Sequence, residues 1–163
     1  MRTNFTSLID SVFLRVHRAA FGFLGEREIA REAAQEALMK AYMMKESYDS
    51  NRPFYPWMYR IVKNTCLDIR KRKRRDPTVL GEVDILPGDS SSPFSLLVQK
   101  QQEKRLWSAM KNLAEDQKEL INLRHFQDLS YAEMAEILSI PIGTVMSRLY
   151  RARKALTTNL MEE

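Results

Sequence analysis

The chain has 163 residues, with 44% hydrophobic and 29% charged side chains, a normal balance for one or two small globular domains. The formal net charge of +5 suggests an anionic partner without requiring one. No apolar run approaches the roughly 18 residues of a membrane span, and the N-terminus lacks an apolar signal core. We therefore expect a soluble, cytoplasmic protein. The single cysteine, Cys66, excludes an internal disulfide and is expected to be a buried thiol.

The first third of the chain predicts two helices. Only five glycines are present, Leu, Ala, Met, Glu, Lys and Arg are abundant, and no stretch alternates like a strand. Helical spacing of apolar residues predicts helices over 5–24 and 26–45, with Gly25 between them. The first is expected to turn one face inward: Ile9, Val12, Phe13, Val16, Ala20 and Phe23. The second is expected to do so with Ala30, Ala33, Ala34, Ala37, Leu38, Ala41 and Tyr42, leaving Glu28, Glu32, Gln35 and Glu36 outside.

A third helix is predicted over 54–75, after a loop over 48–53. Its expected buried stripe is Met58, Ile61, Val62, Thr65 and Ile69. Trp57, Arg60 and Asn64 fall on another common face, flanked by Lys63. Rings that stack, amides that read base edges and cations that hold a backbone suit unpaired bases. Each aromatic taken singly is more often a core residue, so the grouping carries this interpretation.

Charge is distributed unevenly along the chain. Residues 60–75 contain eight basic side chains and one acidic one, whereas residues 76–99 contain four acidic side chains and no basic one. A concentrated basic stretch favours phosphate binding, with a solvated charged face as the alternative. The segment 76–93 is rich in Pro, Gly and Ser, so we interpret it as a flexible linker between two domains.

The C-terminal part predicts four helices, over 94–113, 115–126, 130–138 and 142–156. Ser130 and Glu133 form the S-x-x-E pattern of a capping box at the start of the third. A short turn and Pro141 lead into the last helix, which is expected to bury Val145 and Leu149. Short polar and arginine side chains then remain outside, as in a helix that reads the major groove. The pattern therefore predicts a helix-turn-helix, with two packed helices and a solvated basic surface as the alternative.

Three blocks, in this order, resemble the extracytoplasmic-function (ECF) sigma factors of the sigma-70 family. They are residues 32–36, residues 54–65 and residues 130–156, and the order, spacing and linker match across almost the whole chain. The resemblance implies an all-α fold of two small helical domains joined by a flexible linker. These would be a sigma-2 helical bundle over 1–76, the linker over 77–93 and a sigma-4 helix-turn-helix domain over 94–163.

The resemblance also implies partners and site residues. The partners would be core RNA polymerase (its beta-prime clamp helices and beta flap), promoter DNA and an anti-sigma factor, with no membrane insertion. Core polymerase would bind Glu28, Glu32, Gln35, Glu36 and Lys40. The minus-ten element would be melted and read by Tyr48, Phe54, Trp57, Arg60, Lys63, Asn64, Arg70 and Arg72, with Tyr48 and Asn64 in the pocket for a flipped base. The minus-thirty-five element would be read by Thr144, Met146, Ser147, Arg148, Tyr150, Arg151 and Arg153.

One departure bears on specificity: Met146 stands where the family pattern usually has Lys or Arg, which removes one expected phosphate or base contact. The competing reading is a stand-alone helix-turn-helix regulator, which explains 130–156 but neither the aromatic and basic helix nor residues 32–36. We expect no catalytic residues, metal or cofactor, because His17 and His125 are isolated and no metal-ligand spacing or phosphate loop is present.

Overall fold

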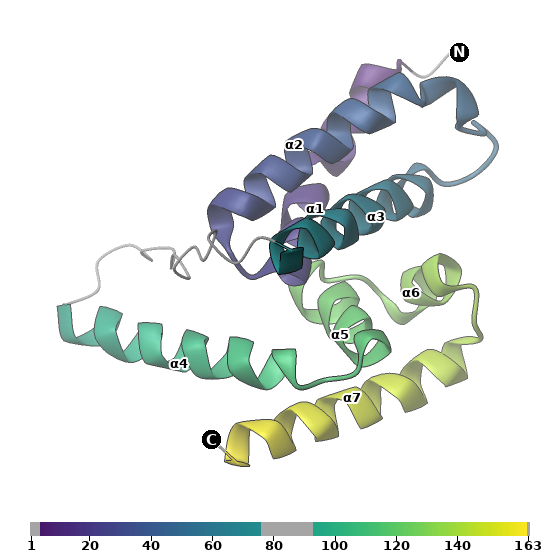
Figure 1. The fold of residues 1–163 in the computed structure, drawn as a ribbon. Coiled ribbons are helices and arrows are strands. Elements are labelled where there is room, and N and C mark those ends of the chain that lie inside the picture. Colours follow the sequence, from purple (N-terminus) through teal and green to yellow (C-terminus); the bar gives the residue numbers. More distant parts are fainter. Residues whose placement is uncertain (1–3, 76–92, 163) are drawn as a thin grey trace.

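The computed structural model describes residues 4–75 and 93–162 (Figure 1), and no strand occurs within these ranges. The helices are α1 (Phe5–Leu24), α2 (Arg27–Met43), α3 (Phe54–Arg75), α4 (Pro93–Lys111), α5 (Glu115–Ile121), α6 (Tyr131–Leu138) and α7 (Ile142–Glu162). A 3-10 turn (Lys45–Ser47) follows α2 and a π-helical turn (Asn122–Phe126) follows α5. The predicted linker lies outside the described residues, apart from Pro93, which begins α4.

Local capping determines where α1 begins and ends. The side chain of Asn4 accepts a hydrogen bond from the Thr6 amide at 3.2 Å, which satisfies a free donor of the first turn. Gly25 adopts the left-handed conformation, with φ of 72°, and its amide donates to the Phe21 carbonyl at 2.8 Å. Glycine enters this conformation without steric cost and is therefore common at helix C-termini. The chain then reverses into α2, as the position of Gly25 in the sequence predicts.

A three-helix bundle forms the N-terminal half, in which α1, α2 and α3 pack pairwise. The buried face of α2 consists of alanines: Ala30, Ala33, Ala34, Ala37 and Ala41. Such small side chains let the larger apolar residues of α1 and α3 approach the α2 backbone closely. Val16, Met58 and Val62 are fully buried in this way. Cys66 is also fully buried, as predicted.

The C-terminal half is built around α7. Helices α4, α5 and α6 all pack on it (Figure 1). Its N-terminal part buries Val145 and Leu149 against α6, where Met134 is fully buried. Near its C-terminal end, Asn159 donates to the Ala109 carbonyl at 3.0 Å and Arg105 donates to the Leu160 carbonyl at 3.1 Å. These two bonds hold α4 alongside α7.

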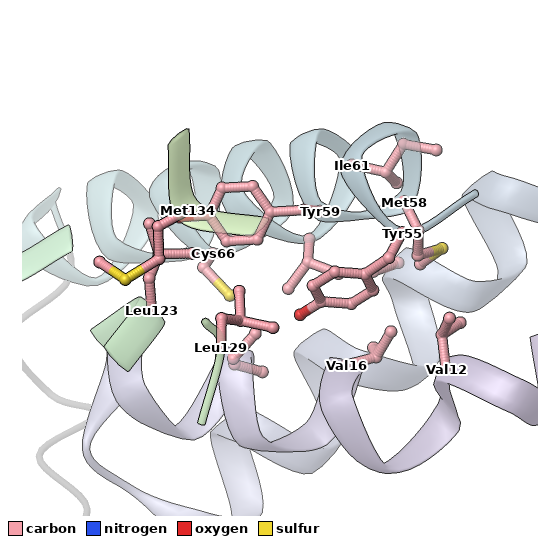
Figure 2. Packing of buried hydrophobic residues seen from close by; sticks show 14 of the residues in the cluster. Val12, Val16, Tyr55, Met58, Tyr59, Ile61, Cys66, Leu123, Leu129 and Met134 are labelled. Carbon is pink, nitrogen blue, oxygen red and sulfur yellow. The ribbon is translucent and has the colours of Figure 1, made fainter. Parts of the chain in front are cut away.

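The two halves share one hydrophobic core. Figure 2 shows residues from both halves in the same cluster, among them Val16, Tyr55, Tyr59, Leu123, Leu129 and Met134. Phe21 of α1 also makes edge contacts with Trp107 and Phe126, at ring-centroid distances of 5.5 and 6.0 Å. The surface of α1 and α3 left open by α2 is therefore covered by the α5–α6 region.

The structure differs from the sequence expectations at two apolar positions and in two helices, of which α7 runs to Glu162 rather than to residue 156. Phe13 is 51% exposed and Tyr42 is 57% exposed, although helical spacing predicted both to be buried. Each lies at the edge of its apolar stripe and is only partly covered: Phe13 contacts the His17 ring of its own helix, and Tyr42 makes an edge contact with the Phe5 ring. The predicted helix over 115–126 is interrupted because it widens at Asn122, whose carbonyl accepts from the Gln127 amide at 3.1 Å.

Candidate nucleic-acid interface

Helices α6 and α7 form the predicted helix-turn-helix. The Ser130 hydroxyl accepts from the Glu133 amide at 3.1 Å, and the Glu133 carboxylate accepts from the Ser130 amide at 2.8 Å. This reciprocal pair is the capping box expected from the sequence. The Ser130 amide, with Arg15 beside it, holds the pKa of Glu133 below its usual range. The carboxylate thus stays charged at the helix N-terminus, where negative charge is favourable.

A tight turn sets the angle between the two helices. Ser139 adopts the left-handed conformation with φ of 54°, and the Ile140 amide donates to the Ala135 carbonyl at 3.1 Å. The carbonyl of Pro141 then accepts from the Thr144 and Val145 amides. With Val145 and Leu149 turned inward, the other side of α7 faces outward. Of the residues of α7 predicted to contact DNA, Thr144 is half-buried and the others are exposed, namely Met146, Ser147, Arg148, Tyr150, Arg151 and Arg153.

Two arginines of α7 are engaged by their own half of the protein. Arg153 donates to His125 Nε2 at 3.1 Å. Burial lowers the pKa of His125, and the cations Arg153 and Arg124 lower it further, so the imidazole is neutral and can accept this bond. Arg151 makes a longer contact, 3.5 Å from its Nε to the Ser147 carbonyl. Arg153 is therefore held toward the π-helical turn that follows α5.

An aromatic cluster stands at the start of α3. The Tyr48 ring packs edge-on against Phe54 with centroids 5.0 Å apart, and it lies 5.4 Å from the Trp57 ring. The Tyr48 hydroxyl donates to the Arg52 carbonyl at 2.6 Å, which fixes the loop. Phe5 of α1 makes edge contacts with Phe54 and Trp57. Phe54 is buried, so it can support the other rings but offers no free face.

A cleft of about 520 Å³ opens beside this cluster. Tyr48 and Trp57 line it together with the cations Arg52 and Arg60, and α6 contributes Glu136 to its rim. Rings and cations in one cleft can stack a base and bind its phosphate. Asn64, expected to share a pocket with Tyr48, does not line this cleft; it is exposed one turn beyond Arg60.

The acidic side of α5 pairs with basic residues of α3. Lys63 donates to Glu119 at 2.7 Å, and the Tyr59 hydroxyl donates to the same carboxylate oxygen at 2.9 Å. Arg70 forms a bidentate pair with Glu115, with both contacts at 3.1 Å. Hydrogen bonds from Arg70 lower the pKa of Glu115 to about 2. Two cations predicted to contact DNA are therefore bound to carboxylates of the other half.

The basic end of α3 is only partly available. Arg72 contacts Glu36 at 3.5 Å, and Lys73 contacts Glu26 at 3.2 Å. Lys71, Arg74 and Arg75 are exposed. In the sequence these basic residues form one continuous run. In the helix they point in different directions, and two of them, Arg72 and Lys73, form ion pairs within the N-terminal half.

The polar face of α2 is accessible, as predicted. Glu32 and Gln35 are exposed, and Glu28 pairs with Arg31 at 2.7 Å. Lys40 lies 2.7 Å from Glu36, and its hydrogen bond lowers the pKa of that carboxyl. Lys40 also donates to the Thr65 hydroxyl of α3 at 3.3 Å. Glu36 and Lys40 therefore take part in contacts between α2 and α3, whereas the exposed Glu32 and Gln35 can contact a partner.

A buried chain of polar groups joins the two halves, and sequence analysis did not find it. The Tyr55 hydroxyl donates to Gln127, Gln127 donates to Asn122 at 3.1 Å, and Asn122 donates to the Ala19 carbonyl at 3.2 Å. Gly22 of α1 leaves the space that the Asn122 side chain fills. Two side-chain amides, directly before and after residues 123–126, are the only signal that the sequence offers.

Other kinds of site find no support in the described ranges. Among residues 4–75 and 93–162, no three His, Cys, Asp or Glu side chains gather where they could hold a metal ion. No helix in those ranges is both long and apolar enough to cross a membrane.

Comparison with known proteins identifies the two halves. Residues 8–76 match the model of sigma-70 region 2, and residues 103–156 match that of sigma-70 region 4. The chain is 30% identical over 167 residues to the ECF RNA polymerase sigma factor SigW of Bacillus subtilis, covering 97% of this chain and 89% of SigW. It is 33% identical to the ECF RNA polymerase sigma-E factor of Escherichia coli, over 77% of this chain and 70% of that protein.

Solved structures are similar over both halves. The sigma factor RpoE of Bartonella quintana, in complex with the anti-sigma factor NepR, aligns with a TM-score of 0.70 and 28% identity over 96% of each chain. CnrH, in complex with the cytosolic domain of CnrY, aligns with a TM-score of 0.69 over 98% of this chain and 88% of CnrH; at 20% identity this likeness shows the fold. From the two region models, the relatives and the helix-turn-helix geometry together, the chain belongs to the ECF sigma factors of the sigma-70 family, which provide RNA polymerase with promoter recognition.

Proposed function

We propose that this sigma factor uses three separate surfaces, two for DNA and one for polymerase. A sigma-2 domain over 1–76 binds core polymerase and melts the minus-ten element, a linker spans 77–93, and a sigma-4 domain over 94–163 reads the minus-thirty-five element. The protein works in the cytoplasm, where polymerase and promoters meet. It takes part in initiation through binding and carries out no catalytic step itself.

The minus-ten surface is the cleft beside Tyr48 and Trp57. Its rings stack an unpaired base, while Arg60 and Arg52 bind the strand's phosphates. Phe54 acts as a positioning residue beneath these rings. Asn64, Lys63, Arg70 and Arg72 extend the surface along α3, although the last three are engaged in ion pairs in the packed arrangement.

The polymerase surface is the exposed side of α2. Glu32 and Gln35 are its accessible centre, and Glu28, Glu36 and Lys40 surround them. An Ala-rich helix with a polar outer face suits docking on another helix. Replacing Glu32 with Lys should weaken binding to core polymerase at least ten-fold, because it reverses a charge in the middle of this surface.

Asp10→Lys provides the matched control. Asp10 is exposed on α1, and the change alters the net charge by the same amount. Co-purification with core polymerase and a titration by fluorescence anisotropy would measure both variants. Equal binding by the two variants would remove the assignment of α2.

The packed arrangement is proposed to be an idle form. The supporting observation is that Lys63 and Arg70 form ion pairs with carboxylates of α5. While they do so, these cations cannot bind the phosphates of a DNA strand. RpoE, in complex with the anti-sigma factor NepR, has a similar overall arrangement, and we propose that an anti-sigma factor holds this chain closed. Core polymerase releases it by engaging the two halves separately. If a candidate anti-sigma factor bound tightly while core polymerase bound the same complex undiminished, inhibition by occlusion would be wrong.

In vitro transcription tests the function as a whole. Core polymerase with this chain should start transcription from a subset of genomic fragments that share two elements at a fixed spacing. Core polymerase alone should not. Tyr48→Ala and Asn64→Ala should reduce strand opening, scored by permanganate reactivity, more than they reduce duplex binding. Strong binding of a palindromic duplex by the free chain as a dimer would instead favour the stand-alone regulator.

A further inference from the structure

The outer side of α7 carries an apolar stripe. Ile142, Met146 and Tyr150 are 48%, 52% and 67% exposed, and they follow one another at intervals of four residues. On an α-helix this spacing makes a slightly slanted row, about 12 Å from end to end. Single exposed apolar residues are ordinary, whereas a continuous row on one helix marks a contact surface.

The surroundings of the stripe indicate what covers it. Ser147 and Arg151 directly follow Met146 and Tyr150 and are also exposed, and the exposed Lys154 continues the row one turn beyond Tyr150. The stripe thus lies among cations on the second helix of a helix-turn-helix, which is the element that enters the major groove. The positive rim complements DNA phosphates, and the major groove, about 12 Å wide, accommodates the row.

The chemistry of these side chains restricts which base edges they can read. Ile142 and the Met146 thioether have no hydrogen-bond donor, so neither can recognise guanine through its O6 and N7 acceptors. The apolar group that base pairs present in the major groove is the C5-methyl of thymine. A flexible thioether adapts well to such a methyl group.

We propose that Met146, supported by Ile142 and the Tyr150 ring, reads thymine C5-methyl groups in the minus-thirty-five element. This chain therefore prefers thymine at one or two positions where an Arg or Lys in place of Met146 would prefer guanine. The inference rests on the proposed role of α7 in duplex recognition and specifies the base that this helix selects.

The test replaces thymine with deoxyuridine, which lacks only the methyl group. Holoenzyme would first select minus-thirty-five sequences from a randomised duplex library, and each thymine of the selected site would then be replaced singly. At one or two positions the change should weaken holoenzyme binding roughly four-fold, the effect of removing one buried methyl group. Met146→Ala holoenzyme should bind the thymine and deoxyuridine duplexes equally at those positions.

Two further variants separate the possible outcomes. Arg151→Ala should bind more weakly yet keep the discrimination between thymine and deoxyuridine, and Met146→Arg should select guanine where the wild type selects thymine. If no thymine is sensitive to its methyl group while Arg151→Ala still alters binding, the inference is wrong and the role of α7 stands. If no α7 variant changes binding or preference, the proposed duplex recognition itself fails. A dimer of the free chain that Met146→Ala dissociates would assign the stripe to a second copy and overturn the inference.

Discussion

Gly22 allows the two halves to meet at one specific point. A Cβ atom at this position would lie 2.1 Å from the Asn122 side-chain oxygen, much closer than real contacts allow. Asn122 is buried and hydrogen-bonded to Ala19 and Gln127, so it cannot move aside without losing those bonds. Gly22→Ala should therefore cost about 1–3 kcal/mol in the packing of the halves. Small-angle scattering should show a larger radius of gyration for this variant.

Gly143→Ala is the matched control for that change. It is also a helical Gly→Ala substitution, but a Cβ atom at Gly143 would meet nothing within 4 Å. The variant should stay compact and gain up to about 1 kcal/mol from the better helix propensity of alanine. If both variants scattered like the wild type, Gly22 and Asn122 would not be in contact in solution.

Cys66 reports on opening of the N-terminal bundle. Its side chain is fully buried, and burial raises the pKa of the thiol to about 12. Only the thiolate reacts readily, and at pH 8 about one thiol in ten thousand would be ionised in the folded protein. A disulfide reagent should therefore modify Cys66 only after denaturant unfolds the bundle. Rapid modification of the native protein would contradict the packing of α1, α2 and α3.

At the scale of a single element, the capping box of α6 determines the stability of the helix-turn-helix. Ser130→Ala removes the acceptor for the Glu133 amide and should lower the free energy of unfolding by about 1 kcal/mol. Urea denaturation followed by circular dichroism would measure it. Ser11→Ala is the control, because Ser11 is exposed in α1 and its hydroxyl donates only within its own helix. A loss of equal size in the control would show that the cap has no special role.

Among the acidic residues of α5, Glu119 makes the most buried contacts with α3 in the closed arrangement, in which the two halves are packed together. Its side chain is 14% exposed and accepts from both Lys63 and Tyr59. Glu119→Lys should separate the halves, since it removes two hydrogen bonds to a charged group, each worth about 1.5–3 kcal/mol, and adds repulsion. The double variant Lys63→Glu/Glu119→Lys restores an ion pair and should close again. Scattering and amide exchange at α5 would follow both, and a compact Glu119→Lys protein would contradict the closed arrangement.

For the whole molecule, the ion pair between Arg70 and Glu115 determines how closure depends on pH. The pKa of Glu115 is about 2 in the folded protein and would be about 4.3 in an unfolded chain. A carboxyl with a lowered pKa stabilises the folded state above pH 4.3 and loses that contribution as pH falls toward 2. Closure should therefore be unchanged from pH 5 to 8. Because Glu115 is exposed, 1 M salt should weaken its ion pair with Arg70 only modestly. Opening between pH 5 and 8 would contradict this assignment.

Much of the fold and the surface could be predicted because it depends on local signals. The bounds of α1 and α3 follow from apolar spacing, Gly25 and the turn residues before Phe54, and the structure agrees with them. The capping box of Ser130 and Glu133 and the inward-facing Val145 and Leu149 were likewise predicted and are confirmed. The prediction that Phe13 and Tyr42 are buried was wrong, because the spacing of apolar residues defines a stripe on a helix but not how much of that stripe the neighbouring helices cover.

The amino-acid sequence by itself determined the helices, the family and the kinds of residue on each surface, since caps, periodicity and charge act within a few turns of chain. Only the tertiary structure decided which basic residues remain free. Lys63 and Arg70 look equivalent to Arg60 in sequence, yet they face carboxylates that lie 45 or more residues away. The buried bonds of Asn122 and Gln127 to α1 and α3 are long-range in the same way. No local pattern encodes such pairings, because they arise when separate helices pack and bring distant side chains into the same buried space.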